Sequence, residues 1–322
     1  YIRREDEYIV VFEQTGPGVI WRVWSAFASY GHIQIFIDDA EAPVVDMPFN
    51  DFFGRHPAPH NPMGITNVPE LTPTLSRGRN RFLPIPFQRA CKIRLAPNWG
   101  MYYHFTYTTF PADTRLPSYD GTYDSATWMA LAHTDRDMAR RGYALPHHAD
   151  TVVERWATTV ATTPQSYVLH GPRAITGLRI ALDAFDMAQT AQILRDLHIR
   201  ITWDDDTQAS VAAPLGHFFG SAQGVHPHRT LAFGVTTGYA YCHWYMPFAT
   251  RARIELVNHG TAAHHIALQL SHVPLTRDAG TLLRFHAKWH ADAFVDEVQQ
   301  HGRAIDWPML LTNGQGRFCG VH

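Results

Sequence analysis

The sequence predicts an all-β protein made of two tandem antiparallel β-sandwich (jelly-roll) domains with one or two short helices. The main observation is an internal repeat: His32–Gly54 (HIQIFIDDAEAPVVDMPFNDFFG) aligns without a gap with His198–Gly220 (HIRITWDDDTQASVAAPLGHFFG), and ten of the twenty-three positions are identical. Apolar and polar residues alternate within each copy, and Pro- and Gly-rich turns separate the alternating runs. Short alternating strands with frequent turns are typical of sandwiches.

The repeat extends in both directions from these segments. Upstream, Gly16–Ile20 corresponds to Gly171–Ile175, and downstream Ile85–Asn98 corresponds to Met246–His259. The landmarks keep their order but not their spacing, which indicates that loops vary while strands are retained. A period of about 160 residues is far too long for a solenoid or propeller repeat. We therefore interpret the chain as a duplicated domain.

The strand prediction is clearest at the start of each repeated segment. In HIQIFI and in HIRITW, every second residue is large and apolar, which is the period of a strand with one buried face. The residues expected to be buried in equivalent positions are Ile33, Ile35 and Ile37 in the first copy and Ile199, Ile201 and Trp203 in the second.

Two helices interrupt the β pattern. We expect one over Ala126–Arg141, capped by Asp124 or Ser125, and a second over Phe185–Leu194. The predicted organisation is a first jelly roll over residues 1–115, a linker with a helix over 116–150, and a second jelly roll over 151–322. Both chain ends lie in strand-like runs, so we expect this sequence to be an internal part of a longer protein.

Composition excludes several functional classes. The chain has 322 residues and a formal net charge of −2, which gives no electrostatic basis for binding nucleic acid or an anionic membrane. No apolar run reaches the roughly 20 residues that span a bilayer. Cys91, Cys242 and Cys319 are widely spaced and are expected to be unpaired thiols. The cysteines do not indicate a cellular compartment. Phosphate-loop, dinucleotide and nucleophile-elbow motifs are lacking, and we expect no cofactor.

The duplicated Asp38–Asp39 and Asp204–Asp205 pairs allow two interpretations. They could form a duplicated calcium or sugar site, or they could shape tight turns in which Asp side chains bond the backbone. The turn is favoured, because strand-like sequence resumes directly after each pair.

The two Phe-Phe-Gly segments differ in the residue that precedes them, which is Asp51 in one copy and His217 in the other. The segments are interpreted mainly as aromatic packing, with one copy open to divergence into a site. A second candidate is the basic run Arg284–His290, which as a strand would put its basic side chains on one face and its aromatic ones on the other. Such a wall fits a sugar or carboxylate, or equally a subunit contact. The candidate substrate-binding residues are Asp51, His217, His286, Lys288, Trp289 and His290.

Neither a metal site nor a catalytic pair is predicted. His286 and His290 would share one face of a helix, but the Glu of the HExxH pattern is missing, and no other histidine group has metal-ligand spacing. Glycoside hydrolysis needs two carboxylates about 5 to 10 Å apart, and no convincing pair stands out among the few glutamates. The catalytic residues are therefore unknown at this stage.

Five motifs of the second copy resemble a family formerly known only as a domain of unknown function and now treated as glycoside hydrolases, the α-D-fructofuranosidases and D-arabinofuranosidases. The resemblance covers most of the chain from Ala174 to His322, and the first copy is similar to the extra N-terminal jelly roll of longer relatives. The motifs stand in this order: Ile201–Asp204, Pro214–Gly220, Met246–Asn258, Arg284–Trp289 and Gly314–Gly320.

The resemblance implies jelly-roll domains, a carbohydrate substrate and assembly as a homo-oligomer, a trimer or hexamer. Two departures limit it. His217 stands where the family usually has Asp, and the family's catalytic glutamates follow the last motif, so they are expected beyond His322. The chain would then supply scaffold, subunit contacts and pocket wall to a furanosidase. The alternative is a non-enzymatic jelly-roll protein that binds carbohydrate or forms a shell.

Overall fold

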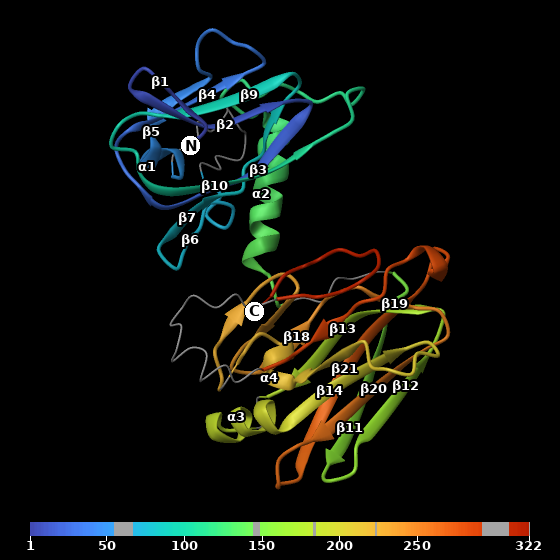
Figure 1. Cartoon of the computed structure of the whole chain (residues 1–322). Helices are drawn as coiled ribbons and strands as arrows, with labels where there is room; N and C mark the ends of the chain where they lie inside the picture. Colours follow the sequence, from blue (N-terminus) through green and yellow to red (C-terminus); the bar gives the residue numbers. More distant parts are fainter. Residues whose placement is uncertain (55–66, 144–148, 183–184, 223, 292–308, 322) are drawn as a thin grey trace. The chain divides into compact units, whose positions relative to one another are not determined.

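The chain folds into two compact units, Tyr1–Arg140 and Arg141–His322, in the computed structural model (Figure 1). The structure describes all residues except 55–66, 144–148, 183–184, 223, 292–308 and 322. Each unit is a β-sandwich of two mainly antiparallel sheets, so the predicted all-β class is confirmed.

One sheet of the first unit has the strand order β1-β2-β9-β4-β5, and the other has the order β10-β3-β7-β6 with β8 also paired to β3. The strands are β1 (Arg3–Glu5), β2 (Tyr8–Thr15), β3 (Gly18–Ala28), β4 (His32–Ile37), β5 (Val45–Pro48), β6 (Thr74–Leu75), β7 (Gly78–Arg81), β8 (Ile85–Phe87), β9 (Ala90–Leu95) and β10 (Gly100–Thr109).

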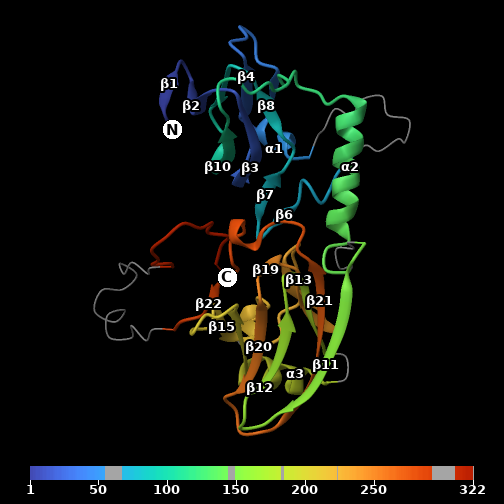
Figure 2. The same cartoon turned by 90° about the vertical axis from the view of Figure 1, so that its right-hand side faces the viewer.

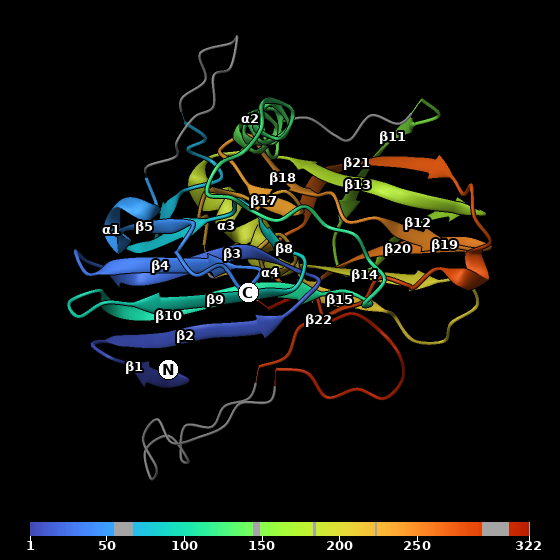
Figure 3. The ribbon, with the colours of Figure 1, turned by 90° about the horizontal axis from the view of Figure 1, so that it is seen from above.

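The second unit repeats this plan and extends it. Its sheets have the orders β12-β20-β14-β15-β22 and β11-β21-β13-β18-β17-β16, with β19 also paired to β13. Figure 3 shows the two layers, with β13 and β21 in one and β14 and β20 in the other. The strands are β11 (Val152–Val160), β12 (Gln165–His170), β13 (Arg173–Ala181), β14 (Leu197–Trp203), β15 (Val211–Pro214), β16 (His228–Arg229), β17 (Phe233–Val235), β18 (Tyr239–Cys242), β19 (Met246–Phe248), β20 (Arg251–Asn258), β21 (His264–Pro274) and β22 (Ala287–Lys288).

The repeated segments occupy equivalent strands with equivalent partners. β4 pairs with β5 and β9, and β14 pairs with β15 and β20. Ile35 lies opposite Ile93 in the first copy, as Ile201 lies opposite Ile254 in the second. The six residues predicted to be buried are at most 4% exposed. The predicted equivalence of the two copies is therefore confirmed.

The two predicted helices are present. α2 (Ser125–Ala139) begins at Asp124, whose carboxylate accepts the amide of Thr127 at 2.7 Å, and α3 (Met187–Asp196) begins with a capping box at Asp186. α2 lies within the segment expected as a linker, and its Trp128 is buried in the core of the first sandwich. None of the described helices is long and apolar enough to cross a membrane.

The Phe-Phe-Gly segments form single helical turns, α1 (Phe49–Phe52) and α4 (Leu215–Phe218), directly after β5 and β15. Both phenylalanines of each segment are at most 6% exposed and belong to the core of their own sandwich. The segments thus pack into each core, which confirms the packing interpretation. The remaining short helix is η1 (Ala279–Thr281).

Candidate functional site

The duplicated aspartates hold two turns together in each copy. Asp38 accepts hydrogen bonds from the amides of Gln88, Arg89 and Ala90, and its equivalent Asp204 accepts the amides of Ala249 and Thr250, both at 2.7 Å. Both residues have positive φ, 54° and 56°, a conformation that Asp tolerates better than most residues. The structure therefore favours the turn interpretation over a calcium or sugar site.

These bonds also fix the charge of the two aspartates. Burial raises the pKa of Asp38, but hydrogen bonds from Ser118 and the backbone amides outweigh it and hold the pKa below its usual range. For Asp204, burial is again outweighed by the backbone amides and by Arg284. Both carboxylates are consequently ionised at neutral pH, as structural acceptors.

The candidate residues Asp51 and His217 occupy equivalent positions in different units. Asp51 lies in α1 of the first sandwich and His217 in α4 of the second. They are therefore related by the duplication.

The basic run forms only a two-residue strand. β22 adds parallel to β15 at the edge of its sheet, as Figure 2 shows. The run does not form a uniform basic wall, because Arg284 binds the carboxylate of Asp204 at 2.9 and 3.1 Å and Lys288 donates to the carbonyl of Ala209. Phe285 packs against the core, and its carbonyl accepts the indole N–H of Trp203 at 2.7 Å.

Trp289 lies in a cluster that we call the histidine–tryptophan patch: His198, His217, His259 and Trp289. The ring centroids are 5.5 Å apart for His217 and Trp289, 6.3 Å for His198 and Trp289, and 4.2 Å for His198 and His259. His198 is the second residue of β14, and Trp289 directly follows β22. His286 and His290 are exposed beside Trp289 in the chain.

The electrostatics of the patch keep its centre neutral. Burial, followed by the positive charges of His259, Arg200 and His217, lowers the pKa of His198 to about 4. A neutral imidazole can both donate and accept a hydrogen bond. Trp289 is 43% exposed, so the patch offers a flat apolar ring next to small polar groups.

No three His, Cys, Asp or Glu side chains converge as metal ligands within the described residues. The exposed ring of Trp289 beside two imidazoles suits stacking and hydrogen bonding to a small polar molecule.

Sequence reasoning missed two members of the patch and one entire cluster. The repeat places His198 only in a strand and His259 only at the end of another. The usable signal is that a histidine begins both repeated segments, as His32 and His198. The missed cluster contains Glu154, Tyr167, Arg173 and His272, which line a cavity of about 360 Å³ in the second sandwich. These residues come from four different strands, and no local motif unites them.

The comparisons with known proteins agree with the predicted resemblance. The family model described as GH172 first beta-sandwich domain matches residues 1–127, and the one described as GH172 domain-like matches residues 156–269. Among curated proteins, none matches the chain.

Two solved structures are weakly similar. The major capsid protein P2 from bacteriophage PM2 is 8% identical, with 84% of this chain and 92% of that chain covered and a TM-score of 0.22. A putative secreted protein from Eubacterium rectale is 10% identical, with 83% and 69% covered and a TM-score of 0.19. Scores this low bear on neither fold nor function.

The two family matches fall on the two sandwiches in their expected order, and each lies within one unit. The second match ends at residue 269 and does not include the C-terminal residues of its unit. The predicted resemblance, including the extra N-terminal domain, is thereby confirmed. The chain belongs to the GH172 family, and it carries that family's first β-sandwich domain followed by a GH172-like domain.

Proposed function

We propose that this chain is the two-sandwich part of a glycoside hydrolase that acts on fructofuranosides or arabinofuranosides, and that the histidine–tryptophan patch contacts the sugar. The family match supports glycoside-hydrolase-like function. The furanoside substrate rests on the motif resemblance described above. The observation that carries the role of the patch is the exposed indole of Trp289 beside His217 and the neutral His198.

The chemistry of the patch suits a furanose ring. An indole face packs against the C–H groups of a sugar, while imidazole nitrogens bond its hydroxyls. The patch itself contains no carboxylate, so in this proposal it binds and orients the ring. The acid and the nucleophile that cleave the bond are the glutamates expected in sequence beyond His322.

The test is hydrolysis of aryl α-D-fructofuranosides and D-arabinofuranosides by a protein extended past His322. Trp289→Ala should lower kcat/KM about tenfold, which corresponds to about 1.4 kcal/mol of lost sugar contact. Trp21→Ala is the matched control, because Trp21 is 45% exposed in the first sandwich and should leave kcat/KM unchanged.

Equal loss in both variants, or none in Trp289→Ala, would remove the patch from the proposal. If the extended protein hydrolyses no furanoside at all, the enzyme assignment fails and the shell-forming or carbohydrate-binding alternative takes its place. Assembly is proposed to be a homo-oligomer, and sedimentation measures it directly.

A further inference from the structure

Each sandwich has an open pocket at its surface, and the two pockets lie at equivalent places. In the first, a cavity of about 240 Å³ lies between β2 and β10; in the second, the cavity of about 360 Å³ lies between β12 and the β11–β21 pair. Phe12 lies opposite Ile93 as Tyr167 lies opposite the equivalent Ile254. In the same way, Tyr107 and His272 lie opposite the equivalent residues of β3 and β13, Ile20 and Ile175.

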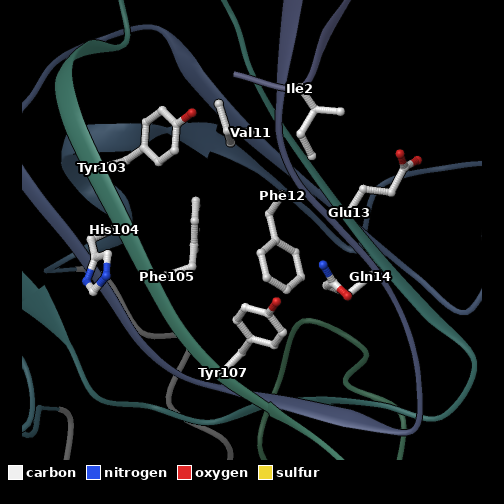
Figure 4. Close-up of a pocket in the computed structure, with 9 residues that line it drawn as sticks. All are labelled: Ile2, Val11, Phe12, Glu13, Gln14, Tyr103, His104, Phe105 and Tyr107. Carbon is white, nitrogen blue, oxygen red and sulfur yellow. The ribbon is translucent and has the colours of Figure 1, made fainter.

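The duplicated cavities differ in chemistry. Figure 4 shows Phe12, Phe105 and Tyr107 facing one another in the first cavity, and the rings of Phe12 and Tyr107 meet edge-to-face with centroids 5.0 Å apart. At the equivalent positions the second cavity has Tyr167 and His272. The first cavity therefore has an aromatic pair at the positions where the second has Tyr167 and His272, a polar pair.

The second cavity contains a chain of polar contacts. The Nε–H of Arg173 donates to Nδ1 of His272 at 2.7 Å, and the Tyr167 hydroxyl donates to Glu154. Because Nδ1 accepts this bond, the neutral imidazole has its hydrogen on Nε2. Burial lowers the pKa of His272, more than the neighbouring Glu154 raises it, so the ring is neutral at pH 7.

His272 has a buried donor without a hydrogen-bond acceptor. Its Nε2 lies 3.3 Å from the nearer Glu154 oxygen, but it makes no hydrogen bond in the described structure, and the residue is only 2% exposed. A buried donor in this state gains from an acceptor with better geometry. A hydroxyl group entering the cavity would accept from Nε2 and donate to the Glu154 carboxylate.

From these contacts we infer that the cavity lined by Glu154, Tyr167, Arg173 and His272 is a second ligand site, which binds a single neutral sugar ring or a similar small polyol. The guanidinium and the carboxylate balance each other, so neither an anion nor a cation is favoured. Both donors and acceptors are present, as a polyhydroxylated ligand requires. Val152, Val168 and Leu169 supply an apolar wall, and the volume is near the lower end of small-molecule sites.

The test is calorimetric or NMR titration of the 322-residue chain with D-fructose, D-arabinose and D-glucose, with D-glucuronate and D-glucosamine as charged comparisons. We expect at least one neutral sugar to bind more tightly than both charged ones. The double variant Tyr167→Phe/His272→Tyr, which copies the aromatic pair of the first cavity, should weaken that binding at least tenfold. Tyr107→Phe in the first cavity should leave it unchanged.

The first sandwich already accommodates this aromatic pair, so the double variant is expected to fold. If it does not, Glu154→Gln provides the second measurement, because it keeps the shape and removes one charge. Trp289→Ala separates this site from the histidine–tryptophan patch and should not alter the titration. Preferential binding of the charged sugars, or neutral-sugar binding that survives both cavity variants, would overturn the inference.

Discussion

Asp204 provides the sharpest test of how the repeated sequence holds the fold. Its carboxylate accepts two backbone amides at 2.7 Å from the β19–β20 turn and pairs with Arg284 at 2.9 and 3.1 Å. Hydrogen bonds to a charged group contribute about 1.5–3 kcal/mol each. Water can reach the partly exposed turn, so the lower value applies, and the two amide bonds together contribute about 3 kcal/mol.

Asp204→Ala should therefore lower the free energy of unfolding of the second sandwich by about 3–5 kcal/mol, including the strain of alanine at positive φ. Asp204→Asn keeps an acceptor for the amides and tolerates the same backbone conformation. It should cost only about 1–2 kcal/mol, for the lost charge opposite Arg284. The matched control is Asp205→Asn, whose side chain is 82% exposed and which should change stability by less than about 0.5 kcal/mol.

Urea unfolding followed by circular dichroism measures all three variants, with separate transitions assigned to the two sandwiches. The pKa of Asp204 is lowered by folding, so its charged form stabilises the folded state above the ordinary Asp pKa of about 3.9. The gap between wild type and Asp204→Asn should fade as the pH falls below that value. A loss under 1 kcal/mol in Asp204→Ala, or calcium stabilisation of wild type that Asp204→Ala abolishes, would refute this account.

Three further predictions use separate features. Cys319 is exposed, whereas Cys91 and Cys242 are buried and burial raises the pKa of both thiols. A thiol reagent should therefore modify one cysteine in the native chain and all three only after unfolding. Rapid labelling of all three in the native chain would contradict this. NMR should find the His198 ring neutral down to about pH 5, because its pKa is lowered to about 4, and a midpoint near 6.5 would be the opposing result. Trp128→Ala should destabilise the first sandwich by about 3–5 kcal/mol, measured by urea unfolding, and a loss confined to the second transition would show that α2 does not belong to the first core.

The strands were predictable because their information is local. Period-two alternation identifies the buried face of β4 and β14 without any knowledge of the partner strands. The cap of α2 at Asp124 is equally local. The partners of Asp38 were not predictable in this way, because its carboxylate binds amides some fifty residues further along the chain. Sequence alone could recognise a turn residue but not the second turn that it holds.

The candidate site was predicted only in part for the same reason. The motifs single out His217 and Trp289, whose rings lie 5.5 Å apart. The repeat assigns His198, which lies beside Trp289, only to the strand framework. Glu154 and His272 come together only because β11 pairs with β21, a contact that joins residues more than a hundred positions apart. Pairing between distant strands depends on the whole fold and leaves little trace in the flanking residues.

The duplication separates structural roles from chemical ones. Where the two copies agree, as at Asp38 and Asp204, the residue holds backbone or fills a core, so the agreement follows from a shared architecture. Where equivalent positions differ, as at Tyr107 and His272, the first copy has aromatic packing and the second copy has polar side chains in the equivalent cavity. A buried polar group is tolerated when it finds a hydrogen-bond partner, and Arg173 is that partner for Nδ1 of His272. The Nε2 atom of the same ring lies 3.3 Å from Glu154 without a hydrogen bond. The differing positions of the second copy are therefore where binding chemistry in this chain is to be sought.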